Sequence, residues 1–187
     1  MIEDNGDFML FAYNEFSVRE AQESDRDAIW NWRNSAVVRA WMGNSAEIPH
    51  EDHIRWFARR RETRTGIFIL YWDERPIGVF TFRPDPNEPS TRLMTMYLIE
   101  QYQNAGLGIV LEWFMLERAF SDPEFTIVAG ILFEDNQVLS LHRFFQFNVA
   151  PVEDGFLRIS MDRRRYQDIA PSIKSKIFRG CDPLKIL

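Results

Sequence analysis

A glycine-containing octapeptide carries the clearest chemical signal in the chain. "QYQNAGLG", residues 101–108, lies between a run typical of a strand, "RLMTMYLIE", and a run typical of a helix, "LGIVLEWFMLERAF". Glycines at such a junction leave backbone N–H groups unshielded, and the helix that follows adds the positive end of its dipole. Phosphate or pyrophosphate binds well at such a junction. The residues leave one alternative open, which is an ordinary turn from a strand into a helix.

Two common phosphate-binding motifs do not fit the octapeptide. A Walker loop needs a lysine directly after its last glycine, but Ile109 follows Gly108. A dinucleotide-binding fingerprint needs a third glycine three residues further on, where the chain has Leu111. The octapeptide therefore belongs to neither of these classes.

Histidine and cysteine offer little further chemistry by spacing. His50 and His53 lie three residues apart on one predicted helix and could share a metal ion, but no set of carboxylates accompanies them, which favours surface histidines and no metal. Cys181 is the one cysteine and cannot form an internal disulfide. The basic run "RWFARRRETR" fits either a solvated helix face or a phosphate-binding patch.

Composition narrows the class of protein. The net charge is −6 and the pI is 5.2, which disfavours a general nucleic-acid binder. The first ten residues are acidic, and no apolar stretch approaches the ~20 residues of a membrane span, so we expect a cytoplasmic protein without a membrane partner. A content of 45% hydrophobic residues predicts one globular domain over residues 1–187, with 1–14 as a flexible or strand-like extension.

The elements around the octapeptide predict a mixed α/β fold. After a strand at "FSVREA", Ser24 is a candidate N-cap for a helix, and "AVVRAWMG" and "PHEDHIRWFARRRE" predict two more helices. Three strands with short connections follow, then the helix from Leu107 to Phe120 and the apolar run "FTIVAGILF", predicted as a strand buried on both faces. A helix in "EDNQVLSLHRFFQF", a hairpin turning near Asp154 and Gly155 and a partly helical tail complete the chain.

Two of these motifs together resemble the GCN5-related N-acetyltransferases (GNAT). Gln103, Gly106 and Gly108 are similar to the Q/R-x-x-G-x-G/A motif of that family, and "EDNQVLSLHRFFQF" is similar to its next helix. Gln146 stands where the family usually has glycine, and the stretch from Asn136 to Phe147 is one residue shorter than usual. The resemblance implies an α/β (α+β) single domain, with a mixed twisted sheet of about six to seven strands and helices on both faces.

The resemblance also implies a co-substrate, acetyl-CoA, and no metal. Its pyrophosphate would lie on the backbone of the octapeptide and its pantetheine arm along the "MYLIE" strand. The residues implied in cofactor binding are Leu98, Ile99, Gln103, Asn104, Ala105, Gly106, Leu107, Gly108 and Asn136.

In this family an amine attacks the thioester directly, and a backbone N–H of the splayed strand stabilises the oxyanion. Tyr97, Leu98 or Ile99 would supply that N–H. His142 aligns with a tyrosine that donates a proton to the leaving thiolate in relatives, although a histidine packed at the edge of the core fits equally well. Tyr97 and Glu100 are further candidates for acid and base.

The helical region 32–56 indicates the acceptor. Its W-R-N…V-R…M…I…H…W pattern resembles the GNAT subgroup that acetylates nucleotide-linked amino sugars in the pseudaminic acid pathway. Arg33, Arg39, Met42 and His53 would then bind the acceptor. The alternatives are a ribosomal-protein or peptide N-terminal acetyltransferase and a non-catalytic module that binds acyl-CoA. A homodimer through the C-terminal hairpin is a further option.

Overall fold

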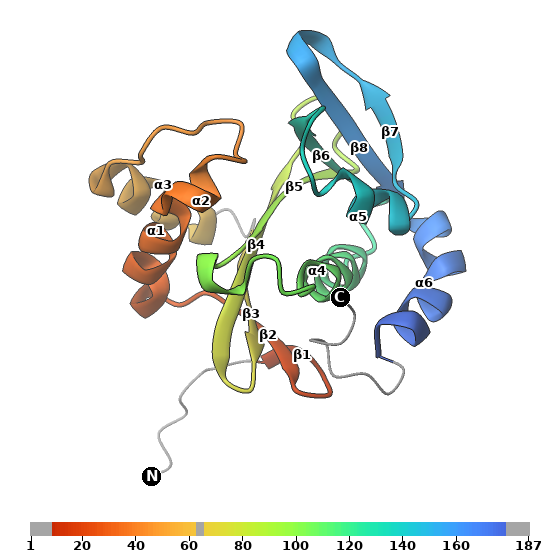
Figure 1. The fold of residues 1–187 in the computed structure, drawn as a ribbon, viewed down its shortest axis with the longest axis horizontal. Helices are drawn as coiled ribbons and strands as arrows, with labels where there is room; N and C mark the ends of the chain where they lie inside the picture. The colour runs from red at the N-terminus through yellow and green to blue at the C-terminus, as the bar shows by residue number, and fades with distance from the viewer. Residues whose placement is uncertain (1–8, 63–65, 179–187) are drawn as a thin grey trace.

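The computed structural model describes residues 9–62 and 66–178, which form one eight-stranded sheet with helices on both faces (Figure 1). The strand order is β1-β2-β3-β4-β5-β6-β8-β7, and every neighbouring pair is antiparallel except β5 and β6. The strands are β1 (Met9–Tyr13), β2 (Phe16–Glu20), β3 (Ile67–Trp72), β4 (Arg75–Pro84), β5 (Thr91–Leu98), β6 (Ile127–Phe133), β7 (Asn148–Pro151) and β8 (Phe156–Asp162).

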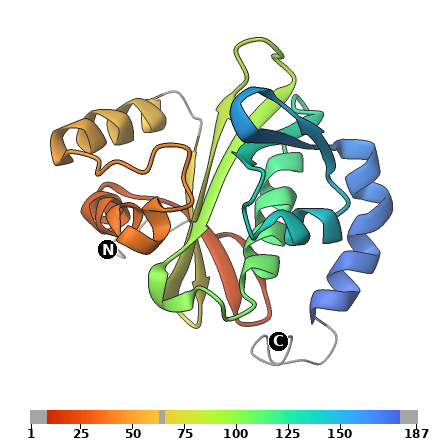
Figure 2. The same cartoon turned by 45° about the horizontal axis from the view of Figure 1, so that its top comes forward.

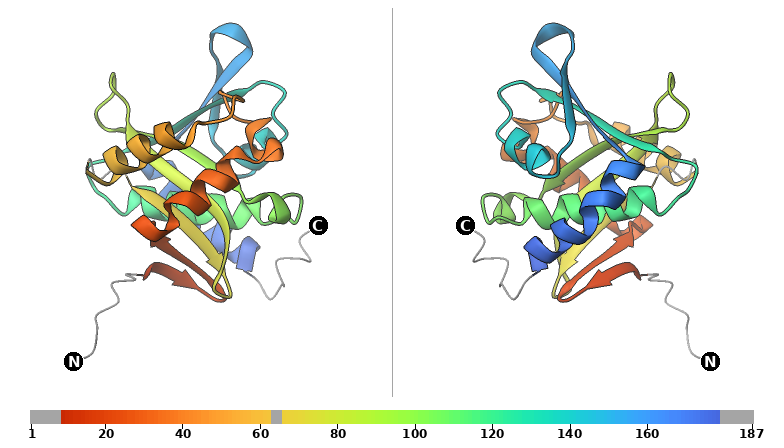
Figure 3. Two further views of the ribbon diagram at one scale, coloured as in Figure 1. Left: turned by 90° about the vertical axis from the view of Figure 1, so that its left-hand side faces the viewer. Right: turned by 90° about the vertical axis from the view of Figure 1, so that its right-hand side faces the viewer.

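The helices form two layers, one on each side of the sheet (Figures 2 and 3). One layer contains α1 (Arg26–Asn34), α2 (Ala36–Arg39) and α3 (His50–Glu62). The other contains α4 (Gly108–Phe120), α5 (Leu139–Phe144) and α6 (Arg163–Phe178). Short 3-10 turns cover Glu23–Asp25, Glu100–Tyr102 and Glu153–Gly155. The predicted fold class is confirmed, and β1 is the strand beyond the six or seven expected.

Each face of the sheet has its own hydrophobic core. The larger core lies against α4, on which nine residues are buried, and the smaller one centres on Ile29 of α1 and Phe57 of α3. Because side chains alternate along a strand, Met96 and Leu98 of β5 pack toward α4 while Tyr97 packs toward α1 and α3. Strand β5 therefore separates the two layers.

The first helix begins differently from the prediction. Ser24 is not its N-cap: the chain makes a 3-10 turn at Glu23–Asp25, and α1 begins at Arg26. Asp25 immediately precedes α1, but its carboxylate caps the 3-10 turn, because it accepts the backbone N–H of Gln22 at 2.7 Å. The same carboxylate accepts two hydrogen bonds from Arg19, at 2.6 and 2.9 Å. Helix α2 is also shorter than expected, since it ends at Arg39 rather than near Gly43.

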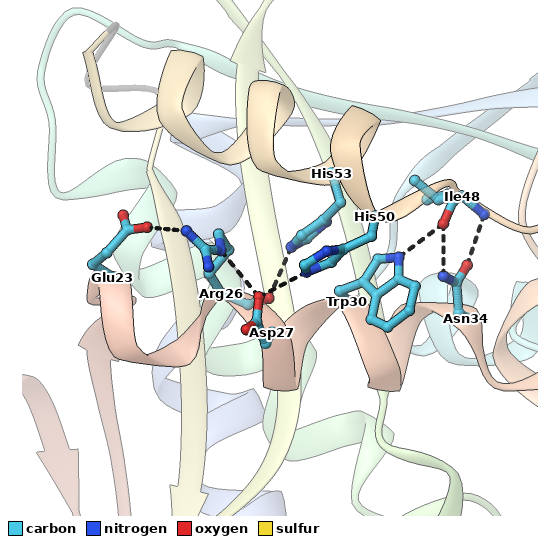
Figure 4. Close-up of polar contacts among 8 residues, drawn as sticks. All are labelled: Glu23, Arg26, Asp27, Trp30, Asn34, Ile48, His50 and His53. Carbon is cyan, nitrogen blue, oxygen red and sulfur yellow. Dashed lines mark hydrogen bonds and ion pairs between the residues drawn. The ribbon is translucent and has the colours of Figure 1, made fainter.

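Polar contacts fasten α1 to α3 and to the loop before it (Figure 4). The indole of Trp30 donates to the carbonyl of Ile48 at 2.8 Å, and the amide of Asn34 makes two hydrogen bonds of 2.9 Å to the backbone of Ile48. His50 bonds Asp27 at 2.9 Å, and the buried His53 donates to the carbonyl of Arg26 at 2.8 Å. These bonds hold α1 and α3 together.

The hairpin between β7 and β8 turns where predicted, with Asp154 and Gly155 at φ 61° and 74°. Cys181 lies outside the described residues, as does most of the predicted N-terminal extension. No helix in the described ranges is long and apolar enough to cross a membrane.

Candidate active site

The sheet opens between its two parallel strands. Pairing of β5 with β6 ends at Leu93 and Ala129, although β5 continues to Leu98 and β6 to Phe133. A cavity of about 470 Å³ lies at this opening. Its walls come from both strands, from the start of α4, from the segment before and within α5, and from the end of α2 with the loop after it.

Strand β6 is not buried on both faces as predicted. Ile131 is 54% exposed because its side chain borders the cavity rather than a packed layer. Three more of the large exposed apolar side chains border the same cavity: Val37, Trp41 and Val138. The cavity therefore has an apolar rim.

The octapeptide forms a turn with unused backbone donors. Asn104 and Gly106 adopt left-handed conformations, at φ 61° and 73°. The N–H groups of residues 104–109 find no acceptor within the part of the chain that the structure describes. On either side, by contrast, Gln103 donates to Glu100 at 3.1 Å and Val110 donates to Leu107 at 3.1 Å. Six consecutive donors thus precede or open α4, where the helix dipole adds positive potential.

Gly108 places this turn against the cavity and against α5. A Cβ atom at this position would meet Cδ2 of Leu141 at 3.2 Å, so the glycine allows close approach of α5. Gln103 packs its side chain back on the strand, donating to the carbonyl of Leu98 at 3.3 Å. Gln103, Asn104 and Gly108 line the cavity, whereas Ala105, Gly106 and Leu107 do not.

Strand register selects one candidate for the oxyanion donor. The N–H of Ile99 donates to the carbonyl of Ile77 in β4 at 2.9 Å. Two residues earlier, Tyr97 pairs with Val79 of the same strand. In an antiparallel ladder, the residues between such pairs turn their N–H groups to the other side. The N–H of Leu98 therefore points toward the opening, whereas those of Tyr97 and Ile99 serve the sheet.

His142 lies in the cavity wall and is bonded to a buried glutamate. Its side chain on α5 is 5% exposed, and its Nδ1 lies 2.6 Å from Oε1 of Glu112 on α4, which is fully buried. Burial raises the pKa of Glu112, and the interaction with His142 opposes that rise. Phe147 packs its ring edge-on to the imidazole, with centroids 5.3 Å apart. His142 is thus both packed at the edge of the core and open to the cavity.

Sequence reasoning missed Glu112. The available signal is a single acidic residue inside the apolar run "GIVLEWFML", at a position surrounded by buried neighbours. A charged side chain at such a position needs a partner, because an unpaired buried charge is costly. The partner is thirty residues away in sequence and becomes adjacent only when α5 packs on α4.

Tyr97 and Glu100 lie differently from His142. The hydroxyl of Tyr97 donates to the carbonyl of Ile29 in α1 at 3.5 Å, and burial raises the pKa of Tyr97, so the phenol stays protonated. Tyr97 lines the cavity. Glu100 is exposed in the 3-10 turn after β5 and is not part of the cavity wall.

Asn136 shapes the entry into α5. It is 7% exposed, it lines the cavity, and its side-chain oxygen accepts the N–H of Val138 at 3.1 Å. Gln146, after the same helix, has φ 61°, which explains why glycine suits this position in relatives. The chain keeps the required backbone conformation there despite the different residue.

The residues predicted to bind the acceptor separate into two groups. Met42 lines the cavity, but His53 does not, because its ring is buried against α1. Burial lowers the pKa of His53, which suits a neutral ring donating to a carbonyl. His53 is therefore not the surface histidine that its spacing favoured.

Arg33 and Arg39 lie behind the rim and hold the loop after α2. Arg33 donates to the carbonyl of Asn44 at 3.1 Å, and Arg39 donates to that of Ser45 at 3.4 Å. Nη1 of Arg33 and Nε of Arg39 are buried and find no acceptor among the described residues. Burial lowers the pKa of Arg33, although a guanidinium remains charged at neutral pH.

Acidic residues do not line the cavity within the described ranges. In the same ranges, no group of three or more histidine, cysteine, aspartate or glutamate residues is placed to hold a metal ion. The polar atoms at the site are backbone amides, side-chain amides, hydroxyl groups and one imidazole. Such a set suits an anionic ligand and proton transfer.

Solved structures share this architecture. The aminoglycoside acetyltransferase AAC(6')-Ib bound to coenzyme A matches with a TM-score of 0.71 and 17% identity, over 83% of this chain and 99% of that one. The protein yncA from Salmonella typhimurium with acetyl-CoA matches with a TM-score of 0.66 and 19% identity, over 80% and 94% of the two chains. Ribosomal-protein-alanine N-acetyltransferase from Brucella melitensis matches with a TM-score of 0.66 and 18% identity, over 78% and 98%.

These structural matches establish a shared fold. The family assignment rests instead on the sequence. No curated protein sequence matches the chain. The family model described as "Acetyltransferase (GNAT) family" matches residues 20–147, which include the turn at 101–108, both strands of the opening and His142. Because this match covers more than half of the chain, the protein belongs to the acetyltransferase (GNAT) family.

Proposed function

We propose that the protein transfers the acetyl group of acetyl-CoA to a primary amine by direct attack within a ternary complex. The observation that carries the proposal is the row of six unused N–H groups at residues 104–109 beside the opening between β5 and β6. Those donors suit a pyrophosphate, and the opening suits the pantetheine arm, which would lie along β5 near Leu98 and reach Asn136 on the other wall. Coenzyme A or acetyl-CoA is bound in two of the structures with this fold.

Each chemical role falls to a different group of the site. The N–H of Leu98 stabilises the oxyanion of the tetrahedral intermediate, because it is the donor of β5 that faces the opening. His142 donates a proton to the leaving thiolate. A thiol has a pKa near ~8.5, so this leaving group needs only modest help from an acid. Tyr97 and Glu100 are weaker candidates, since Tyr97 is bonded under α1 and Glu100 faces solvent.

We further propose an anionic acceptor, a nucleotide-linked amino sugar. The unused donors of Arg33 and Arg39 could pair with a diphosphate after a small movement of the loop that they now hold, and Trp41 and Met42 offer flat apolar surface to a base or sugar. Polycationic aminoglycosides, the substrates named for one structural neighbour, need acidic partners, and the cavity wall contains none in the described ranges.

A peptide N-terminus is the second candidate acceptor. The likeness to a ribosomal-protein-alanine N-acetyltransferase favours it, although at 18% identity that likeness concerns the fold. A non-catalytic module that binds acyl-CoA is the candidate of another class. The presence of His142 in the cavity wall argues against such a module, because a binding function does not require a proton donor.

One assay separates these candidates. Purified protein is mixed with acetyl-CoA and, in turn, a UDP-linked amino sugar, a peptide with an N-terminal alanine and kanamycin, and the release of free thiol is followed. We expect release with the amino-sugar nucleotide and little with the others. Release with the peptide only would support the second candidate. Binding of acetyl-CoA by calorimetry without thiol release from any acceptor would support the non-catalytic module.

A further inference from the structure

We infer that Glu112 is a positioning residue that orients His142 and balances its charge, so that the two side chains act as one proton-donating pair. This inference rests on the proposed role of His142 as the acid of the acetyl transfer. Glu112 comes from the middle of α4, and His142 comes from α5. His142 lines the cavity, whereas Glu112 is fully buried and contacts the imidazole from outside the cavity wall.

The hydrogen bond fixes which ring nitrogen can serve the substrate. Nδ1 of His142 lies 2.6 Å from Oε1 of Glu112, and an ionised carboxylate can only accept. With Glu112 ionised, Nδ1 of His142 carries the proton of this hydrogen bond, and Nε2 is the ring nitrogen left for the substrate. Among the described residues, Glu112 is the titratable group in contact with His142, and the ring of Phe147 covers another side.

Burial determines which protonation states the pair prefers. The side chains are 5% and 0% exposed, so an imidazolium without a counter-ion would be costly at this place. With Glu112 ionised, the two-proton pair has no net charge and Nε2 holds a proton that it can give. The one-proton pair carries a single negative charge and leaves Nε2 able to accept.

In the proposed acetyl transfer, this pair supplies one proton and takes one back. The amine nitrogen bonds to the carbonyl carbon, and the C–S bond then breaks with its electrons moving to sulfur. Nε2 gives its proton to that sulfur, which leaves the pair with one proton. The proton that the attacking nitrogen releases restores the two-proton pair, so no other reactant is needed.

A purely structural role explains Glu112 poorly. Its second oxygen, Oε2, is buried and has no partner within the described part of the chain, so the carboxylate is kept at a cost that leucine would avoid. Glu117 on the same helix offers a contrast. It accepts a hydrogen bond of 2.6 Å from Tyr166 of α6 and lies outside the cavity wall.

The test compares Glu112→Gln with the matched variant Glu117→Gln. Glutamine at 112 can still accept a hydrogen bond from Nδ1 but cannot balance an imidazolium. We expect kcat to fall about 10- to 100-fold and the alkaline limb of its pH profile to move to lower pH, as for loss of general acid catalysis. The affinity for acetyl-CoA should change by less than about twofold, and Glu117→Gln should match the wild type in kcat and in pH profile. A folded Glu112→Gln protein with wild-type kcat and pH profile would overturn the inference.

A measurement on the wild-type protein keeps the inference testable if the variant does not fold. Nitrogen-15 NMR of the histidine rings should find Nδ1 of His142 protonated across the pH range of activity. A proton on Nε2 and none on Nδ1 in the neutral ring would overturn it. Failure of the wild type to release thiol with any acceptor would instead refute the proposed acetyl transfer, whatever the NMR result for Glu112.

Discussion

At the scale of single residues, the proposed reaction depends on three groups: the imidazole of His142, the carboxylate of Glu112 and the backbone N–H of Leu98. His142 gains a defined orientation from a bond of 2.6 Å, and Leu98 gains its direction from the pairing of β5 with β4. Their usefulness therefore comes from placement, and each can be removed separately.

Replacing His142 by phenylalanine tests the acid directly. Phenylalanine fills a similar space next to Phe147 but carries no proton to give, so kcat should fall toward the low end of the ~10²–10⁴-fold range for general acid catalysis. The alkaline limb of the pH profile of kcat should also disappear. The matched control is His50→Gln, which removes an exposed histidine bonded to Asp27 on the surface and should leave both quantities unchanged. Unaltered turnover in His142→Phe would remove His142 from the mechanism.

Replacing Arg33 or Arg39 by methionine tests the anionic acceptor. Hydrogen bonds to charged groups contribute about 1.5–3 kcal/mol, so KM for a nucleotide-linked amino sugar should rise about 10- to 100-fold in each variant. A small amine without phosphate should be used as well as before. Arg55→Met is the control, since Arg55 is exposed on α3 and pairs with Asp52. Equal losses for both acceptors would mean that these arginines only hold the loop after α2.

At the residue scale, sequence reasoning succeeded where the partner is local and failed where it is distant. The turn at Gln103, Gly106 and Gly108 could be predicted because glycine spacing and chain order lie in one octapeptide. His53 was assigned to the acceptor site on its place in a pattern, but its bond to the carbonyl of Arg26 depends on how α3 packs on α1. Glu112 was not predicted for the same reason, because its partner, His142, is on another helix.

At the scale of elements, the turn into α4 contains a glycine in the left-handed conformation, Gly106. Gly155, in another turn, has the same conformation and serves as a control. Gly106 and Gly155 have nearly equal φ angles of 73° and 74°, and the second lies at the remote hairpin between β7 and β8. Alanine in this conformation costs roughly 1–2 kcal/mol at either position. The two variants should therefore lose similar stability for the same reason.

Only Gly106→Ala should also weaken binding of acetyl-CoA, by about tenfold or more, because relief of the strain would move the N–H groups of residues 104–109. Titration calorimetry on both variants measures this difference. If Gly155→Ala weakens binding equally, or if neither does, the turn is not the pyrophosphate site.

The junction of β2 with the first helix predicts a dependence of stability on pH. Burial acts to raise the pKa of Asp25, but hydrogen bonds from Arg19 and from the N–H of Gln22 outweigh it and lower the pKa below its ordinary value. A lowered pKa in the folded state stabilises the fold above the unfolded value near ~3.9, and this contribution is lost as pH falls through the folded value.

Asp25→Asn should therefore lower the melting temperature at pH 7. Each kcal/mol lost lowers it by roughly 2–4 °C in a domain of this size. The gap between variant and wild type should narrow as pH falls below about 4, where the unfolded chain binds a proton at Asp25 before the folded protein does. Thermal denaturation followed by circular dichroism at several pH values measures the gap, and a gap that stays constant down to pH 2 would contradict this account of Asp25.

At the scale of the whole molecule, the opening in the sheet is the feature from which the site follows. Strand β6 pairs with β8 along its length but with β5 over only three residues, so the two halves of the sheet diverge. Helices on opposite faces then meet at the divergence: α4 and α5 from one layer, α2 from the other. One cavity is thus lined by the proposed phosphate site from the first layer and by the proposed acceptor rim from the second.

Much of this architecture could be predicted from the sequence, because apolar periodicity and turn residues identify elements well. The strands from Ile67 to Leu98, helix α4 and the final hairpin all lie where predicted. The divergence of β5 from β6 was expected from family resemblance, since no local pattern marks where pairing stops. For the same reason Ile131, in an apolar run that indicates a fully buried strand, borders the cavity. The homodimer stays a prediction.

The most direct test of the proposed function is to map backbone amides by NMR while acetyl-CoA is added. The account predicts that the amide resonances of residues 104–109 shift most, together with that of Leu98, as their free N–H groups gain acceptors. Resonances of the β7–β8 hairpin turn should stay in place. Saturable binding that leaves residues 104–109 unshifted, or no binding at millimolar acetyl-CoA, would contradict the account.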